Sequence, residues 1–291
     1  MAKNCLLTKL KATVNDDSLD ILVTDDYLRM ELPVAANNGV SNVVVIYGTD
    51  EDPVDIEVLD GTINQVPDGS TKTDSTHALI GGGYLNSATR GFTVNSSDGT
   101  VHVIIKNPEK VKGIDGIVSV TGGISAIEKM TGITSLTIND NLRGYSSPAF
   151  DLSDIDWSVF TGINSIKASY LNSVSGNVSN LAALPTVIQS IALNNNSGIT
   201  GNINAFGRLT NLTMLSLTMA KTSGTVESLV QAMRANGKTT NSSGIAIGYN
   251  MGDNVTFNGA AITNNTSKTL TWTASTITIT DGGSYNVTVN A

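Results

Sequence analysis

Residues 188–196 read IQSIALNNN, and the spacing of their apolar residues and final asparagine decides the fold. The stretch follows the pattern apolar-x-x-apolar-x-apolar-x-x-Asn, and residues 133–141 repeat that pattern in full. Side chains alternate between the two faces of a strand, so we expect Ile191 and Leu193 to point into a core. The amide of Asn196 can then bond backbone groups that the following bend would otherwise leave unpaired.

Other copies of the pattern are degenerate. Three fit with one substitution each: residues 163–171, with Leu171 at the asparagine position, residues 212–220, with Ala220 there, and residues 242–250, with Ser242 at the first position. Weaker copies surround Val118 and Leu270. With the second apolar residue of each copy as a marker, the series is Val118, Leu136, Ile166, Ile191, Leu215, Ile245 and Leu270. A recurrence of about 25 residues is typical of stacked strand-and-crossover units such as leucine-rich repeats. The sequence therefore predicts a leucine-rich-repeat-like solenoid over residues 111–275.

The residues between the inward positions should form the outward, concave face of these strands. The candidate face residues are Ser135, Thr137, Asn139, Lys167, Ser190, Asn194, Met214, Ser216 and Thr218. They are mostly small and polar, with one charge and no aromatic residue, whereas tight binding sites are rich in Tyr, Trp and Arg. We therefore favour a scaffold for this surface, with a concave binding face as the alternative.

The return segments carry a second recurrence. Gly176, Gly201 and Gly224 each begin a Gly-x-aliphatic step, which resembles the convex side of leucine-rich repeats. Residues 225–235 read as a capped helix that the following Asn-Gly pair would end, because glycine tolerates the left-handed conformation that closes a helix. Residues 151–160 could form a second helical return.

The composition indicates a turn-rich β protein. Aromatic residues make up 5% and charged residues 14% of the 291 positions, and there are 28 glycines. The predicted fold class is mainly β with short helices: an N-terminal arm (1–15), a β module (16–110), the solenoid, and a C-terminal β-hairpin cap (276–291). Strands of the β module are expected at residues 19–23, 28–32, 40–47, 54–59, 91–94 and 101–106. The cap is predicted from alternation around Asp281-Gly282-Gly283.

Charge and cysteine usage exclude several classes. The net charge of −8 argues against nucleic acid as a partner, because phosphate binding requires basic residues. Cys5 is alone, so no internal disulfide is expected. Residues 1–17 lack the continuous apolar stretch of a signal peptide, and no run approaches the length of a membrane span. We expect a protein made in a cytoplasm, without a membrane partner.

Candidates for chemistry are few. Asp74 and His77 could form an acid–base pair but lie in a polar stretch, and His102 alternates with valines as a strand surface residue would. The acidic loop around Asp50 and Asp55 lacks regular calcium-loop spacing, so a solvated loop is the favoured interpretation and calcium binding stays open. We expect no enzyme activity, no cofactor and no metal site.

The N-terminal segment MAKNCLLTKLKATVN, residues 1–15, resembles the start of structural proteins of phages and prophages of Bacteroides-type hosts. The resemblance implies a virion component, a head or tail fibre or decoration, assembled in the host cytoplasm. Its partners would be other virion proteins, further copies in a homo-oligomer, and a host surface glycan or protein. The expected attachment residues are Lys3, Leu6, Leu7, Lys9, Leu10 and Lys11. The alternative is a bacterial cell-surface or secreted leucine-rich-repeat adhesin; an enzyme acting on polysaccharide would need paired carboxylates, which the repeat region has too few acids to favour.

Overall fold

The computed structural model describes residues 27–33, 44–47, 56–58, 61–62, 77–80, 93–94, 100–115, 119–120, 123–139, 149–169, 174–248, 251–262, 267–281 and 286–290. Over these residues the protein is mainly β, with several sheets and short helices. The predicted fold class is confirmed at that level. The predicted division into arm, module, solenoid and cap stays a prediction.

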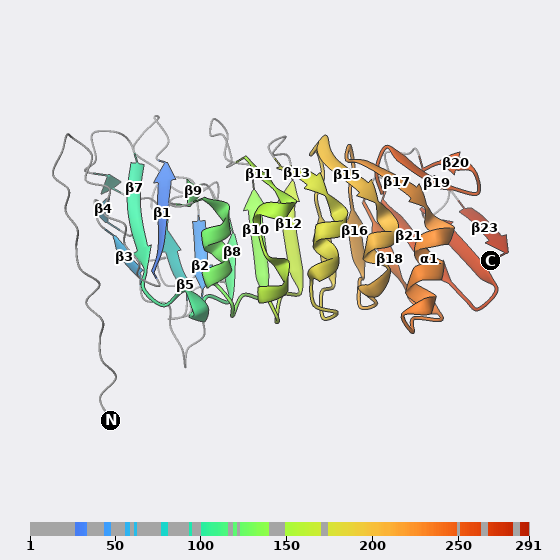
Figure 1. The fold of residues 1–291 in the computed structure, drawn as a ribbon, viewed down its shortest axis with the longest axis horizontal. Helices are drawn as coiled ribbons and strands as arrows, with labels where there is room; N and C mark the ends of the chain where they lie inside the picture. Colours follow the sequence, from blue (N-terminus) through green and yellow to red (C-terminus); the bar gives the residue numbers. More distant parts are fainter. Residues whose placement is uncertain are drawn as a thin grey trace, which may run out of the picture.

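An eleven-stranded sheet runs along the length of the molecule (Figure 1). Its order is β5 (His77–Ile80), β2 (Val44–Tyr47), β8 (Gly113–Asp115), β10 (Ser135–Asn139), β12 (Ser165–Ser169), β14 (Ser190–Ala192), β16 (Met214–Ser216), β18 (Asn241–Ile247), β21 (Lys268–Trp272), β22 (Thr276–Thr280) and β23 (Asn286–Asn290). Neighbours from β8 to β18 are parallel, and the strands at both ends pair antiparallel.

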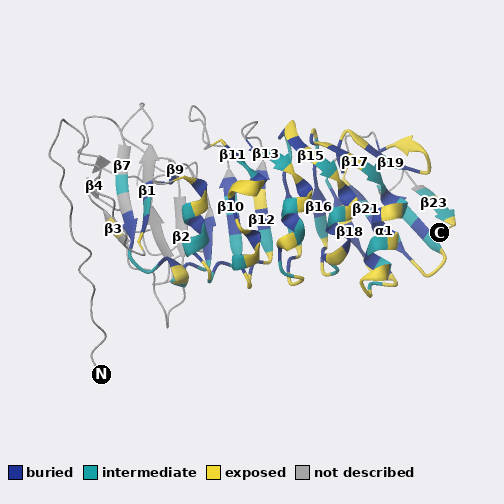
Figure 2. Cartoon of the chain, viewed as in Figure 1, coloured by how far each residue is buried: buried dark blue, intermediate teal, exposed yellow. Residues whose placement is uncertain are grey.

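The apolar positions of the parallel strands form one inward row. Leu136 pairs with Ile166, Ile166 with Ile191, and Ile191 with Leu215, so equivalent residues stack from strand to strand. Every residue of the predicted inward row is buried: Leu136, Ile138, Ile166, Ala168, Ile191, Leu193, Leu215, Leu217, Ile245 and Ile247. Figure 2 shows this buried row continuing along the sheet.

A six-stranded sheet lies on a second side of the same core. Its order is β11 (Phe150–Asp151), β13 (Val174–Asn177), β15 (Gly198–Asn202), β17 (Lys221–Thr225), β19 (Asn254–Phe257) and β20 (Ala260–Ala261). From β11 to β19 the pairing is parallel. From β10 to β18 the chain therefore alternates between the two sheets, with a helical segment before each return to the larger one.

Four of the helical segments are capped by the residue that ends the preceding strand of the smaller sheet. The helical segments are η3 (Leu152–Asp154), η4 (Trp157–Val159), η5 (Val178–Ala183), η6 (Ile203–Arg208) and α1 (Val226–Ala235), after the earlier 3-10 turns η1 (Pro108–Lys110) and η2 (Ile124–Lys129). At the starts of η3, η5, η6 and α1, the side-chain oxygens of Asp151, Asn177, Asn202 and Thr225 accept backbone N–H groups at 2.9–3.1 Å. These bonds satisfy donors that a helix start leaves free.

Glycines give these caps room to stack. Gly176, Gly201 and Gly224 have φ of 108°, 108° and 113°, a region that other residues rarely adopt. A Cβ added at Gly201 would lie 2.2 Å from the Oδ1 of Asn177, the cap of the preceding turn. The Gly-x-aliphatic recurrence in the sequence therefore has a local cause, because each cap side chain occupies the space that the next glycine leaves open.

The predicted helical returns are confirmed in part. Residues 226–235 form α1, capped by Thr225, and Gly237 follows its end with φ of 96°. Residues 151–160 hold two single 3-10 turns, η3 and η4, in place of one helix. Asp151 caps the first turn and Asp156 caps the second. Ile155 lies between the two turns in an extended conformation, so they do not merge into one helix.

In the N-terminal region, the predicted strands at 28–32, 40–47, 54–59, 91–94 and 101–106 correspond to β1 (Leu28–Pro33), β2, β3 (Ile56–Val58), β6 (Thr93–Val94) and β7 (Thr100–Ile105). The prediction at 19–23 lies outside the described residues. Strands β3, β7, β1 and β9 (Ser119–Val120) form a four-stranded sheet, and β4 (Gly61–Thr62) pairs with β6. Strands β2 and β5 instead extend the long sheet, so that sheet crosses the predicted boundary at residue 110.

The prediction that the stretches around Val118 and Leu270 are the first and last parallel strands of the repeat is wrong. The strand beside β10 is β8, where Ile114 pairs with Leu136, whereas Val120 belongs to β9 and pairs with Met30. Both stretches alternate, so periodicity alone did not separate them. Leu270 lies in β21, which pairs antiparallel with β18 and starts the terminal run of hairpins. The hairpin predicted at residues 276–291 is confirmed by β22 and β23.

The register of the last parallel strand also differs from the prediction. We expected Leu215 to align with Ile245, but it pairs with Ile247. A shift of two residues keeps every side chain on the same face, so the apolar pattern fits both registers. The irregularity in β18 lies before Ile245. The pairing with β21 shifts between Asn241 and Ile245, and Gly244 in this segment has φ of 81°.

Candidate binding surface

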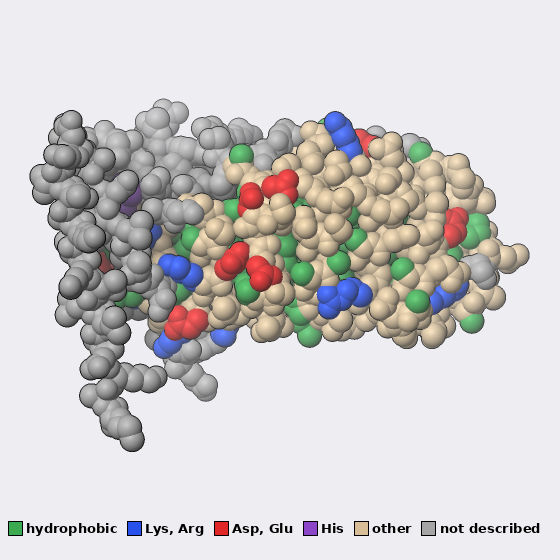
Figure 3. Space-filling view, in the orientation of Figure 1, with side chains coloured by type: hydrophobic (Ala, Val, Ile, Leu, Met, Phe, Trp, Pro, Cys, Tyr) green, Lys and Arg blue, Asp and Glu red, His purple; other side chains and the backbone are tan. Residues whose placement is uncertain are grey.

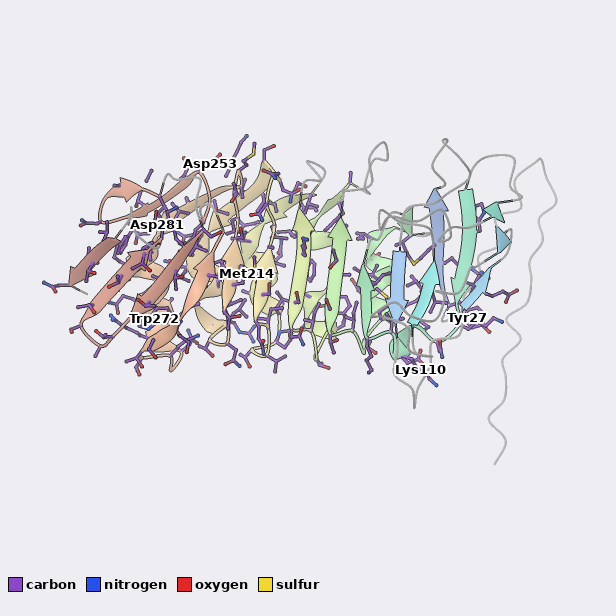
Figure 4. All side chains as sticks on the ribbon, turned by 180° about the vertical axis from the view of Figure 1, so that it is seen from behind. Tyr27, Lys110, Met214, Asp253, Trp272 and Asp281 are labelled. Carbon is purple, nitrogen blue, oxygen red and sulfur yellow. The ribbon has the colours of Figure 1, made fainter. Side chains whose placement is uncertain are left out.

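The outward face of the parallel strands gathers most of the predicted face residues into two rows. One row is Ser135, Ser165, Ser190, Met214 and Ala246, and the other is Thr137, Lys167, Ala192 and Ser216. Asn194 and Thr218 follow at the ends of β14 and β16, and Asn139 pairs with Ser169 at the end of β10. Viewed from behind, Met214 lies near the middle of the sheet (Figure 4).

Lys167 is the exposed member of the set, while Ser135, Thr137, Ser190, Asn194, Met214 and Thr218 are half-buried. Ser190 donates a hydrogen bond to the Sδ of Met214 at 3.5 Å, so the one large apolar side chain of this face bonds its neighbour on the adjacent strand.

The prediction that Ser216 belongs to the outward face available to a ligand is wrong, because this residue is only 1% exposed. Its hydroxyl donates to the Oδ1 of Asn194 at 2.6 Å. On the other side it lies over Gly248, where an added Cβ would be 1.7 Å from the Ser216 Oγ. Neighbouring strands cover the hydroxyl from both directions, so Ser216 is not available to a ligand.

Asn194 organises the end of this face, a role that the sequence argument missed. Its Oδ1 also accepts the backbone N–H of Thr218 at 3.0 Å, which links successive strands beyond the point where the ladder ends. The signal was present in the run Asn194-Asn195-Asn196, but only its last member matched the repeat.

Asn196 does what the repeat predicts for it. It is fully buried, and its Nδ2 donates to the carbonyl oxygens of Ala168, Leu193 and Asn194 at 2.7, 3.2 and 3.1 Å. The first of these bonds reaches the preceding turn of the chain, so Asn196 both closes its own bend and joins two turns. Asn141, Leu171 and Asn250 lie outside the described residues.

Other predicted residues are not brought into this surface. The six attachment residues, Lys3 to Lys11, and the acidic loop around Asp50 and Asp55 lie outside the described residues, as does Asp74. His77 pairs with Tyr47 at the far end of the long sheet, and His102 pairs with Glu31 in the four-stranded sheet. The described residues include no group of three or more His, Cys, Asp or Glu placed to hold a metal ion. Among the described helices, none is long and apolar enough to cross a membrane.

Charges on the helix side are few and scattered (Figure 3). Hydrogen bonds from Ser153, first from its backbone N–H and then from its hydroxyl, lower the pKa of Asp151. Bonds from Ser158 likewise lower the pKa of Asp156. These shifts follow from helix capping, so they do not by themselves indicate catalysis.

One basic side chain, Lys238 in the segment after α1, contacts the first strand of the terminal hairpins. The Nζ of Lys238 donates to the Leu212 carbonyl at 3.3 Å and lies 5.7 Å from the ring centroid of Trp272. The indole N–H of Trp272 donates back to the carbonyl of Lys238 at 3.1 Å. Burial lowers the pKa of Lys238. Each polar contact in this group is made within the protein, which indicates a structural role.

In comparisons with known proteins, no protein-family model and no curated protein sequence matches this chain.

Proposed function

We propose that this chain is a non-enzymatic structural protein of a tailed bacteriophage, which attaches through its N-terminal region and projects a leucine-rich-repeat-like solenoid over residues 111–275. In this proposal the two parallel sheets and the capped helices are the sides of each solenoid turn. Other virion proteins and further copies of the chain are its partners, and the virion is its location.

The observation that carries the scaffold role is the internal bonding of the outward face. The Ser190 hydroxyl bonds Met214, the Ser216 hydroxyl bonds Asn194, and Asn194 also accepts the backbone N–H of Thr218. These polar atoms are therefore already bonded within the protein. A ligand site would instead present polar groups that converge on a shared space, surrounded by large apolar or aromatic side chains. This surface supports a rigid spacer better than a receptor-binding or catalytic groove.

The virion assignment has a separate basis, which is the resemblance of residues 1–15 to phage structural proteins. Lys3, Lys9 and Lys11 precede an acidic stretch, and Leu6, Leu7 and Leu10 supply apolar side chains. A segment of this kind can gain affinity through main-chain hydrogen bonds to another protein's sheet edge.

Mass spectrometry of purified virions from a phage that encodes this chain tests the assignment. We expect its peptides in particles banded in a density gradient, at a constant ratio to the major capsid protein. Detection only on the surface of the bacterial cell or in the secreted fraction would contradict the proposal and favour the adhesin.

A deletion of residues 2–15 tests the attachment role. The shortened protein should keep its β circular dichroism and fail to join the particle. Normal incorporation would place the attachment surface elsewhere on the chain.

A further inference from the structure

Strand β23 lies at one edge of the eleven-stranded sheet, at the C-terminal end of the molecule (Figure 1). It pairs with β22 through five consecutive residues, from Asn286 opposite Thr280 to Asn290 opposite Thr276, without a bulge. Within the described residues, no strand pairs with its other edge. An edge of this kind offers a row of N–H and C=O groups to a further strand.

The two faces of β23 continue the two faces of the sheet. Val287 and Val289 pair with the buried Ile279 and Ile277, so the valines lie on the core side. Both valines are only half-buried and pack against the core as its last layer. Thr288 is exposed on the opposite face, where its hydroxyl lies 2.9 Å from that of Thr278.

The strand has none of the features that usually block edge pairing. Residues 286–290 read NVTVN and contain no lysine, other charged residue or proline. Edge strands of soluble proteins usually carry such residues, or a bulge, to prevent association with another chain.

The sequence NVTVN is also a palindrome centred on Thr288. In an antiparallel pair, two residues that lie opposite each other point to the same face. If two copies of β23 pair about Thr288, each Thr288 faces its counterpart, each Val287 faces a Val289, and each Asn286 faces an Asn290. We propose that β23 is a self-association site, at which two copies of this chain pair antiparallel about a two-fold axis through Thr288 and join their long sheets.

The absence of charge agrees with a second copy as the occupant. A patch that meets itself places like charges together, and residues 286–290 have no charge to repel. The pairing would cover the exposed sides of Val287 and Val289 and extend the core across the axis. Five residues from each copy bury much less than the roughly 800 Å² per partner of a standard interface, so the association should be weak in dilute solution. It would strengthen where other contacts hold the copies close together.

Sedimentation equilibrium of the full chain, up to millimolar concentration, tests this proposal with charge variants of Thr288. We expect the wild type to show a concentration-dependent dimer. Thr288→Lys and Thr288→Glu should each weaken it by about fivefold, because like charges directly opposite each other are destabilising. An equimolar mixture of the two variants should restore the dimer, since Lys then faces Glu.

Thr271→Lys is the matched control. Thr271, Thr278 and Thr288 lie in one row, so the control adds the same charge on the same face two strands from the edge. It should dimerise like the wild type, and all variants should keep the wild-type melting temperature because these positions lie on the solvent side.

Three outcomes would overturn the inference. They are a wild type that stays monomeric at millimolar concentration, a Thr288→Lys variant that dimerises as well as Thr271→Lys, and a mixture of Lys and Glu variants that stays monomeric. The inference does not depend on a virion role, so these results are independent of whether the chain is found in particles.

Discussion

Two successive bends of the chain use different groups to bond their buried carbonyl oxygens. The bend after β14 has Asn196, whose amide bonds the carbonyls of Ala168, Leu193 and Asn194. The bend after β16 has Ala220 at the equivalent position, and it is equally buried. There, Leu217 O accepts the N–H of Ala220 at 2.9 Å, and Thr218 O accepts the N–H of Asn195 at 2.7 Å.

The comparison explains why the repeat can be degenerate. What each bend requires is a donor for its buried carbonyls, and a backbone N–H can replace the asparagine amide when the geometry brings it close enough. Both bends also share a left-handed residue, Asn195 at φ 58° and Met219 at φ 66°. The two bends therefore share the path of the backbone, while the group that bonds the buried carbonyls differs between them.

The largest effect should come from the apolar row that both bends support. We expect Leu193→Asp or Leu215→Asp to unfold the described region from β10 to β18 as a unit, because a buried unpaired carboxylate costs several kcal/mol, on the order of a domain's whole stability. Thermal melting followed by circular dichroism measures this. Ala246→Asp, which adds the same charge at an exposed position of β18, is the control. Near-wild-type melting of the leucine variants would show that this row faces no core.

The next effect concerns the glycine that follows the Asn196 bend. Gly201→Ala should lower the free energy of unfolding by about 3 kcal/mol, because it combines an unfavourable φ with a clash against Asn177. Gly237→Ala has a similar φ but meets no atom within 4 Å, so it should cost about 1–2 kcal/mol. Urea denaturation compares the two variants, and equal losses would mean that the stacked caps do not confine Gly201.

Removal of the Asn196 amide tests the comparison itself. Asn196→Ala should cost about 1–3 kcal/mol, the usual range when buried groups lose a hydrogen-bond partner. The exposed Asn211 is the control, and Asn211→Ala should be nearly neutral. If Asn196→Ala is equally neutral in urea denaturation, the backbone around Asn196 can supply donors as it does around Ala220.

The smallest effect is pH dependence at the first cap. Asp151 is a carboxylate where the following turns use Asn177 and Asn202, and hydrogen bonds from Ser153 lower its pKa. Its contribution to stability is therefore present above the unfolded pKa of about 3.9 and is lost as the pH falls through the lower folded value. The Asp151→Asn variant should show a flatter stability profile between about pH 5 and pH 3. A profile as steep as that of the wild type would assign the slope to other carboxylates.

Much of the fold could be predicted because its determinants are periodic. The inward row, helix α1 and the terminal hairpin all follow from spacing that matches one type of element. The errors occurred where spacing fits two solutions. The stretches around Ile114 and Val120 alternate alike, and a two-residue shift of β18 leaves its faces unchanged.

The candidate face was harder to predict because exposure depends on neighbours in space. Ser216 has the polarity of a surface residue, yet Asn194 and Gly248 on adjacent strands cover it. Their positions relative to Ser216 depend on the strand register, which the apolar pattern alone could not determine.

Native-state hydrogen exchange in increasing urea tests most directly whether these turns form one cooperative body. We expect the amides of β12, β14 and β16 to converge on a single free energy of opening, because the stacked apolar rows join neighbouring turns and the bond from Asn196 to the Ala168 carbonyl joins two of them. Amides of β14 that open at a much lower free energy than those of β16, without converging as urea rises, would contradict it.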